Sequence, residues 1–277
     1  YDLLGLVVGS EGQFGIVTEA KVRILRSPEA ARPMLIGFDS SEAAGKCVAS
    51  IIASGILPVA LEFMDKPAIH VCENFSKAGY PLDVEALLIV EVEGSEEEID
   101  VLLKKIVALA EQFDPPVVRI SESEEQSAAI WKGRKSAFGA MGQISDYYCM
   151  DGTIPTGRLP EVLAEISNIC KRFELQVANI FHAGDGNLHP LVLYDANSPE
   201  QVERAERAGA EILRYCVRVG GCLTGEHGVG IEKRDLMNDQ FSKSDMAQQI
   251  RIKNIIDPDW LLNPGKVFPL AEVSGDL

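Results

Sequence analysis

The sequence predicts an α+β fold in which strands and helices follow one another and two neighbouring strands form a hairpin. Runs with the apolar period of strands alternate with runs that have the period of amphipathic helices, from about residue 30. Ser95 and Ser123 each have a Glu or Gln three residues on, a pattern typical of capped helix starts. A turn rich in Gly, Asp and Asn, at residues 183–188, joins two strand-like runs. These three observations together predict the mixed fold.

The first 30 residues are set apart from the rest of the chain. Strand-like sequence from Ile16 to Leu25 runs into residues 27–33, whose Ser and Pro content is typical of a linker. Ordered-looking sequence starts abruptly at residues 4–20, so we expect either a fragment or a partner domain encoded elsewhere. The expected divisions of the chain are residues 1–30, residues 31–270 and a tail at 271–277.

The apolar patterns assign the elements in order from residue 34. Positions 44, 47, 48, 51 and 52 are apolar and share one face, which predicts a helix over 41–54. Pro199 follows the expected N-cap Ser198, and the helix that it opens is expected to reach about Val219. The expected strands are 34–38, 59–64, 86–93, 117–120, 147–154, 177–180 and 191–194. The expected helices are 41–54, 67–77, 96–113, one capped by Ser123, 159–173, 199–219 and 244–256.

Composition and charge limit the classes of function. Hydrophobic residues make up 46% of the 277 residues and charged residues 25%, as in an ordinary globular protein. The net charge is −16 and the sequence has no basic block, which argues against nucleic-acid binding. No apolar stretch approaches the roughly 20 residues that a membrane-spanning helix needs. The six cysteines form no Cys-x-x-Cys pair, so we expect reduced thiols in a cytoplasmic protein.

Two of the four histidines, His182 and His189, lie at the two ends of the predicted hairpin turn. If the flanking strands pair, both imidazoles can project from one face within reach of one divalent ion. The competing interpretation is that both histidines only hydrogen-bond the turn. Asp185, inside the turn, is expected to form the turn or to hold a metal ligand in place.

Glu226 and His227 lie in a glycine-rich stretch, residues 220–230. Two histidines and a carboxylate are a common set of ligands for catalytic zinc, and His182, His189 and Glu226 supply that set. Non-haem iron uses the same donors, so the identity of the metal stays open. Adjacent side chains are expected to diverge, which leaves His227 to act as a general base. The alternative is a buried histidine that only hydrogen-bonds its turn.

Three further segments are candidates on their residues alone. Arg134 lies on a predicted helix, where its guanidinium can hold a carboxylate bidentately or belong to a solvated basic face. Gly9, Gly12 and Gly15 form a turn in which backbone amides can approach a phosphate. Their spacing does not match G-x-G-x-x-G before a helix, which argues against a Rossmann site. Asn-Pro-Gly-Lys at 263–266 has the composition of a turn.

These motifs together resemble the FAD-linked D-2-hydroxyacid dehydrogenases of the vanillyl-alcohol oxidase superfamily, a family that includes glycolate oxidase D subunits, D-lactate dehydrogenases and D-2-hydroxyglutarate dehydrogenases. Residues 9–18 are similar to the closing segment of the family's FAD-binding domain. Residues 182–189, 225–228 and 262–266 are similar to three signatures of its C-terminal substrate domain, in the expected order. The resemblance covers almost the whole chain.

The resemblance implies a ferredoxin-like, largely antiparallel sheet covered by helices, which forms a lid over the flavin and is preceded by the last segment of an FAD-binding domain. Residues 1–30 are then the C-terminal remnant of that domain, and residues 31–270 are the substrate domain. In the family, most of the FAD-binding domain precedes the position of Tyr1, and FAD is bound mainly there.

The resemblance also implies roles for single residues. His182, His189 and Glu226 correspond to ligands of a divalent metal, zinc; His227 corresponds to the base; and Arg134 corresponds to the contact with the substrate carboxylate. The implied flavin contacts are Gly9, Ser10, Glu11, Gly12, Gly15, Ile16 and Asn263. Cys149 stands where some members have a lysine, which weakens any inference about a dicarboxylate substrate.

The expected reaction is the oxidation of a 2-hydroxyacid such as glycolate or D-lactate to the 2-oxoacid. The metal binds the substrate hydroxyl and carboxylate, His227 takes the hydroxyl proton, and a hydride passes to the flavin. The isolated fragment is expected to be inactive. Two alternatives stay open: a self-contained zinc metallohydrolase with the same ligands, and a non-catalytic lid subunit that needs a flavin-carrying partner.

The resemblance also bears on partners. A small 2-hydroxyacid and an N-terminal FAD-binding domain are the expected ones. Iron–sulfur electron-transfer subunits, a peripheral membrane position and homo-oligomers stay open.

Overall fold

A computed structural model describes residues 1–270, and the expected tail at 271–277 lies outside the described residues. Its contacts form two compact units: the sheet unit is Ser27–Gly221, and the terminal unit joins Tyr1–Arg26 to residues 222–270. The sequence predicts one substrate domain over residues 31–270, whereas the contacts associate residues 222–270 with the N-terminal segment. The domain boundaries stay a prediction, because a compact unit of contacts is not by itself a functional domain.

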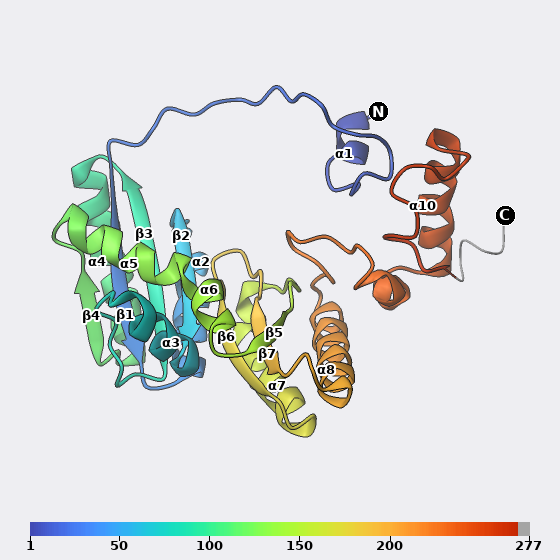
Figure 1. Cartoon of the computed structure of the whole chain (residues 1–277). Coiled ribbons are helices and arrows are strands. Elements are labelled where there is room, and N and C mark those ends of the chain that lie inside the picture. The colour runs from blue at the N-terminus through green and yellow to red at the C-terminus, as the bar shows by residue number, and fades with distance from the viewer. Residues whose placement is uncertain (271–277) are drawn as a thin grey trace. The chain divides into compact units, whose positions relative to one another are not determined.

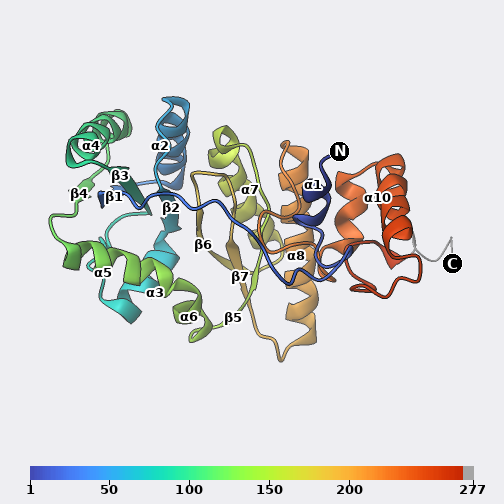
Figure 2. The same cartoon turned by 90° about the horizontal axis from the view of Figure 1, so that it is seen from above.

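The sheet unit is built on one antiparallel sheet (Figure 1). In the described part of the chain its seven strands lie in the order β4-β1-β3-β2-β6-β7-β5, and neighbouring strands pair antiparallel. Residues 86–90 of the interior strand β3 are all buried, because helices cover both faces of the sheet, as Figure 2 shows. The strands are β1 (Ala30–Phe38), β2 (Ala60–Asp65), β3 (Ala86–Gly94), β4 (Val117–Ile120), β5 (Asp146–Cys149), β6 (Gln176–His182) and β7 (Pro190–Tyr194).

Helices α2, α4 and α7 lie on one face of the sheet, and α3, α5 and α6 lie on the other, as Figure 2 shows from above. The second group closes a core around Leu35, Met64, Leu87 and Ile180. Helix α8 packs along α7 and β7. The helices are α2 (Ser41–Ala53), α3 (Lys66–Ser76), α4 (Glu96–Ala110), α5 (Glu124–Lys135), α6 (Ala137–Gly142), α7 (Leu159–Arg172) and α8 (Pro199–Arg218).

The helix starts expected from the sequence are found. Ser95 and Glu98 form a complete capping box at α4. The side chains of Ser123 and Ser198 accept the backbone N–H three residues on, at the starts of α5 and α8. These caps satisfy amides that have no partner within the helix.

The terminal unit has little regular structure. Its helices in the described residues are α1 (Leu3–Val7), α9 (Met237–Gln240) and α10 (Lys243–Ile256), besides a short 3-10 turn. Turns and irregular segments connect them. Hydrogen bonds between side chains and the backbone therefore carry much of its geometry.

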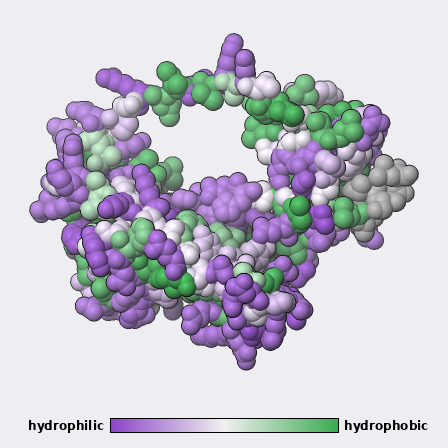
Figure 3. Space-filling view, viewed as in Figure 1, coloured by the Kyte–Doolittle hydropathy of each residue, from purple (hydrophilic) through white to green (hydrophobic). Residues whose placement is uncertain are grey.

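The predicted α+β class, with an antiparallel sheet covered by helices, is confirmed. The strand expected over residues 16–25 is wrong, because this segment is extended but forms no strand (Figure 1). Ile16, Val22 and Ile24 are 83%, 78% and 86% exposed, and the hydrophobic colour along this segment is visible in Figure 3. A strand needs a hydrogen-bonding neighbour, and none of residues 1–270 pairs with this segment.

Two other boundaries differ from the sequence prediction. Strand β1 begins at Ala30, inside the expected linker 27–33, because it pairs with β3 from that residue on. The strand expected over 147–154 ends at Cys149, and residues 150–154 instead support the neighbouring hairpin turn.

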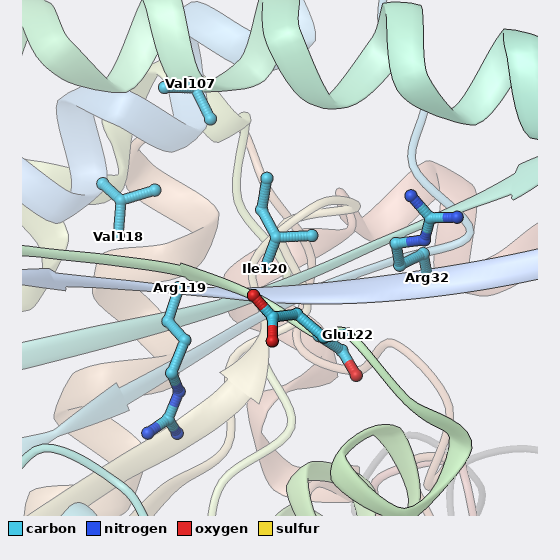
Figure 4. Close-up of a pocket in the computed structure, with 7 residues that line it drawn as sticks. Arg32, Val107, Val118, Arg119, Ile120 and Glu122 are labelled. Carbon is cyan, nitrogen blue, oxygen red and sulfur yellow. The ribbon is translucent and has the colours of Figure 1, made fainter.

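An opening of about 660 Å³ lies between α4 and the edge strand β4 (Figure 4). Val118 and Ile120 point toward Val107 of α4, whereas Arg119 points to the other side of the sheet. Three strands separate β4 from β6, so this opening lies away from the β6–β7 hairpin and its two histidines. In residues 1–270, no helix has both the length and the apolar character needed to span a bilayer.

Candidate functional site

The histidine pair of the sheet unit lies on the hairpin that the sequence predicts. Strands β6 and β7 pair antiparallel, with His182 ending β6 and His189 directly preceding β7. The two imidazole centroids are 5.5 Å apart and the rings are nearly perpendicular, at 83°. One ring nitrogen of each lies within 4.8 Å of the other, a separation that one metal ion can bridge.

Hydrogen bonds within the turn, and others from residues outside it, stabilise the turn between the two histidines. The Asp185 carboxylate accepts a hydrogen bond from the backbone N–H of Asn187 at 3.0 Å. Asp185 therefore forms the turn, which is one of the two roles expected for it. The Asn187 side-chain amide donates to Asp151 at 2.9 Å. Gly186 has a φ of +78°, and a Cβ there would lie 2.1 Å from the carbonyl oxygen of Ile154. Only glycine fits this position, because the backbone conformation and the close approach both exclude a side chain.

His189 is buried, with 1% of its surface exposed. Its Nδ1 lies 3.3 Å from the carbonyl oxygen of Met150, and its ring packs edge-on against Phe138. A carbonyl only accepts, so Nδ1 carries the proton and Nε2 carries the lone pair. Cys149 Sγ lies 4.0 Å from the same Nδ1, which places this thiol beside the histidine.

His182 is oriented by a residue that the sequence analysis did not single out. Its Nδ1 lies 2.8 Å from Oε1 of Glu62, a buried carboxylate on β2. Glu62 and His182 are direct partners in the β2–β6 register, so strand pairing sets them side by side. The only sequence signal for Glu62 was a single charge inside an apolar strand.

Arg134 is buried rather than solvated, which rules out the solvated-face interpretation. It lies in the last turn of α5, where 6% of its surface is exposed. Its Nε donates to Glu62 Oε2 at 3.0 Å, and its NH2 lies 2.8 Å from the same oxygen, out of line for a hydrogen bond. The guanidinium therefore neutralises Glu62 and keeps N–H groups that can meet a second acceptor.

A small opening of about 260 Å³ adjoins His182 within the sheet unit. Its polar wall is formed by Glu62, His182 and Asp185, and its apolar wall includes Ile52 and Leu61. The opening gives the histidine site a neighbouring space with both polar and apolar contacts.

In the terminal unit, Glu226 and His227 lie on a loop with exposed side chains. Oε1 of Glu226 lies 3.7 Å from Nε2 of His227, so the expectation that these side chains diverge is wrong. The loop turns sharply after them, because Gly228 and Gly230 have φ values of +86° and +55°. The Thr224 hydroxyl supports this turn by accepting the Gly228 N–H at 2.9 Å.

Glu11 links three parts of the terminal unit. Its carboxylate accepts the N–H groups of Val229 and Gly230 at 2.7 and 2.8 Å. Its backbone carbonyl accepts the side-chain amide of Asn263. The expected flavin contact by Glu11 can therefore come from its backbone, because the carboxylate already binds the loop that follows His227.

Gln13 and Lys253 bind the same loops through hydrogen bonds from their side chains. Gln13 is 2% exposed, and its side-chain amide donates to the carbonyl oxygens of Asn263 and Lys266. Lys253 of α10 is fully buried and donates to the carbonyls of Gln13 and Leu262 and to the carboxylate of Asp257. No local pattern in the sequence marks Gln13 or Lys253 as structural residues.

Comparison with protein families gives a match over most of the chain. A family described as FAD linked oxidases, C-terminal domain, matches residues 27–267. Glycolate oxidase subunit GlcD of Escherichia coli is 47% identical over 97% of this chain and 54% of the relative. The GlcD of Bacillus subtilis is 36% identical over 97% of this chain and 57% of its own length. The D-lactate dehydrogenase [cytochrome] 1 of Saccharomyces cerevisiae is 27% identical over 97% and 47%. This chain thus spans about half the length of these relatives.

Solved structures agree on the fold. A p-cresol methylhydroxylase matches with a TM-score of 0.64 at 16% identity, over 88% of this chain and 54% of that one. An alkyldihydroxyacetonephosphate synthase matches with a TM-score of 0.65 at 14% identity, over 95% and 50%. At these identities the likeness concerns the fold alone.

Proposed function

Because this chain belongs to the FAD-linked oxidases through their C-terminal domain, we propose that it is the substrate part of a flavoenzyme that oxidises a small 2-hydroxyacid to the 2-oxoacid. Glycolate and D-lactate are the favoured substrates, since relatives that cover 97% of the chain are named for them. A self-contained metallohydrolase gives no role to the turn at residues 9–15 or to Asn263.

The histidine pair of the sheet unit is the observation that carries this proposal. Both rings have Nδ1 bonded to an acceptor, Glu62 for His182 and the Met150 carbonyl for His189. That arrangement is common for histidines that bind metal through Nε2, so the donor set fits a divalent ion such as zinc. We propose His182, His189 and Glu226 as its ligands. Such an ion lowers the pKa of a hydroxyl group that it contacts.

The terminal unit is proposed to contribute to the flavin site. Gly9 and Gly15 have positive φ, and a Cβ at either would meet no atom within 4 Å, so the backbone is open to a ligand there. The proposed contacts are Gly9, Ser10, Glu11, Gly12, Gly15, Ile16 and Asn263. FAD, when bound, accepts a hydride from the substrate carbon.

Two side chains are proposed to act on the substrate. His227 takes the hydroxyl proton as the C–H bond breaks, since histidine is the side chain that most often transfers protons in catalysis. Arg134 binds the substrate carboxylate with N–H groups that Glu62 does not engage. Both roles require the remainder of the flavin site, so this chain alone is proposed to be inactive.

Partners of the chain are proposed from the relatives. Two relatives are named as subunits, which supports assembly with other chains. An FAD-binding domain is the first proposed partner, and iron–sulfur subunits that accept electrons from the flavin are the second.

Metal content of the purified chain tests the proposed centre. We expect close to one equivalent of zinc to remain after dialysis, and His182→Ala to lose most of it. His70→Ala is the matched control, because His70 lies on α3 and its Nε2 lies 3.1 Å from the carbonyl oxygen of Leu82. Equal zinc in the His182→Ala chain and the unchanged chain would contradict the proposed ligands.

Turnover by the full-length protein tests the reaction. We expect a flavin absorbance spectrum that bleaches with glycolate, D-lactate or D-2-hydroxyglutarate, together with reduction of an artificial dye acceptor. His227→Ala should lower the rate by about 10²–10⁴-fold, the usual contribution of a general base. Full-length protein with no flavin spectrum and no dye reduction by any of the three acids would overturn the proposed function.

A further inference from the structure

Glu62 is the buried charge that connects the candidate metal centre to the protein interior. It lies in the middle of β2, where its side chain is 7% exposed. A buried carboxylate is costly unless it is both paired and hydrogen-bonded. Among residues 1–270, Glu62 meets both conditions through two side chains, one on a neighbouring strand and one on a helix.

The two oxygens of Glu62 have separate partners. Oε1 lies 2.8 Å from Nδ1 of His182, and Oε2 lies 2.8–3.0 Å from NH2 and Nε of Arg134. The β2–β6 register fixes the first contact, while Arg134 reaches Glu62 from the last turn of α5. Because Arg134 occupies Oε2, the carboxylate cannot rotate away from His182 without losing its ion pair.

This arrangement determines the chemistry of the His182 ring. A carboxylate accepts a hydrogen bond, so the proton of the neutral ring is held on Nδ1 and the lone pair on Nε2. A carboxylate partner also makes the opposite nitrogen a better metal ligand and fixes the plane of the ring. Neither effect requires contact between Glu62 and the ion.

We propose that Glu62 is a positioning residue that sets the metal affinity of His182, and that Arg134 holds Glu62 in place for this task. This inference rests on the proposed metal centre. It also gives Arg134 a role that does not depend on contact with substrate. Loss of a hydrogen-bond partner behind a metal-binding histidine commonly weakens metal affinity by about 10–100-fold, and that is the expected effect here.

Zinc affinity of the purified chain, measured by competition with a chromophoric chelator, tests the proposal. We expect Glu62→Gln to weaken Zn²⁺ binding about 10–100-fold and His182→Ala to weaken it further. Glu91→Gln is the matched control: Glu91 is a half-buried carboxylate on β3, on the same face as Glu62 by register, and it accepts from Trp131 at 2.7 Å. Its substitution should leave zinc affinity unchanged.

A spectroscopic measurement separates positioning from general destabilisation. In the metal-free chain, ¹⁵N chemical shifts of His182 should report the Nδ1–H tautomer, and Glu62→Gln should shift the ring toward a mixture of tautomers. Because Glu62→Gln leaves the buried guanidinium without its anion, the double variant Glu62→Gln/Arg134→Met removes both charges and gives a folded alternative. It should show the same loss of zinc affinity.

The outcomes distinguish this inference from the proposed function. If the unchanged chain and His182→Ala bind Zn²⁺ equally, the proposed metal centre fails. If His182→Ala weakens binding while both Glu62 variants bind like the unchanged chain, the metal centre stands and the role of Glu62 is overturned. An unchanged tautomer in Glu62→Gln also contradicts the role.

Discussion

The sheet unit and the terminal unit fix their candidate residues by different means. In the sheet unit, His182 ends strand β6 and His189 directly precedes its paired strand β7, beside an apolar core, and Nδ1 of each ring faces an acceptor in the protein interior. In the terminal unit, His227 and Asn263 lie in loops that side chains bind through backbone groups. Strand pairing beside an apolar core thus places the candidate residues of the first unit, and hydrogen bonds from buried side chains to the backbone place those of the second. The same class of substitution should therefore have different effects in the two units.

Lys253→Met should give the largest effect, because it removes the fully buried ammonium that joins Gln13, Leu262 and Asp257. Breaking a buried charge pair from one side costs about 3–5 kcal/mol. The free energy of unfolding is measured in urea by the fluorescence of Trp260. Because the chain has two tryptophans, Trp131→Phe is used as the background, so that the signal comes from Trp260 near the substitution. Trp260 also contacts Lys253 directly, with Nζ 5.4 Å from its ring centroid.

Lys46→Met is the control for this prediction. Lys46 pairs with Glu42 one helical turn away on the exposed side of α2 in the sheet unit. An exposed pair of this kind contributes about 0.3–0.5 kcal/mol. A similar loss of stability for both lysine variants would contradict the idea that buried polar bonds hold the terminal unit.

Buried aspartates should give opposite pH dependence in the two units. In the sheet unit, burial raises the pKa of Asp65 from 3.8 to about 6. As the pH rises, the unfolded chain loses this proton at a lower pH than the folded chain does. The free energy of unfolding therefore falls between about pH 4 and about pH 6, by roughly 3 kcal/mol in total. In the terminal unit, the hydrogen bond from Lys253 lowers the pKa of Asp257. Its stabilising contribution is present above about pH 4 and is lost as pH falls through the lowered pKa.

Unfolding free energies measured from about pH 2 to about pH 7 check this prediction, because Asp257 titrates below about pH 4 and Asp65 between about pH 4 and 6. Asp65→Asn should remove the decline between about pH 4 and 6, because asparagine can still cap α3 but carries no charge. Asp83→Asn, at an exposed position, should leave the decline in place. If the free energy of unfolding of Asp65→Asn still declines over this pH range, a group other than Asp65 causes the decline.

The sequence predicted the sheet unit better than the terminal unit, for a physical reason. Local patterns determine strands and helix caps, so the β6–β7 hairpin, the histidine pair and Ser95, Ser123 and Ser198 could be found by spacing. The family was identified from motifs, and the comparison over residues 27–267 confirms it.

Contacts between distant positions could not be found in this way. Glu62 contacts a histidine 120 residues away, and Lys253 contacts Gln13 across 240 residues. Neither pair leaves a mark in local periodicity. The expected strand at 16–25 failed for a related reason, because its apolar alternation is local whereas a strand needs a partner.

The smallest predicted effect is the difference in stability between Gly228→Ala and Gly230→Ala, which tests how the loop after His227 is held. Both glycines have positive φ, so alanine at either should cost about 1–2 kcal/mol of backbone strain. A Cβ on Gly228 would also lie 2.8 Å from the Glu11 carboxyl carbon, while one on Gly230 would meet no atom within 4 Å. Gly228→Ala should therefore cost about 1–3 kcal/mol more than Gly230→Ala. The added methyl group displaces the Glu11 carboxylate, which then loses its charge-assisted hydrogen bonds from the N–H groups of Val229 and Gly230.

A Glu11→Ala background makes that comparison decisive, because the obstructing carboxylate is then absent. The two alanine variants should differ in the unchanged chain and become equal in Glu11→Ala, as measured by the fluorescence of Trp260 during urea unfolding. Exchange of the Val229 and Gly230 amide protons should quicken in Glu11→Ala and in Gly228→Ala, but less in Gly230→Ala. If Gly228→Ala keeps its extra cost without Glu11, the carboxylate does not hold this loop, and the position of His227 depends on Thr224 and the backbone turn instead.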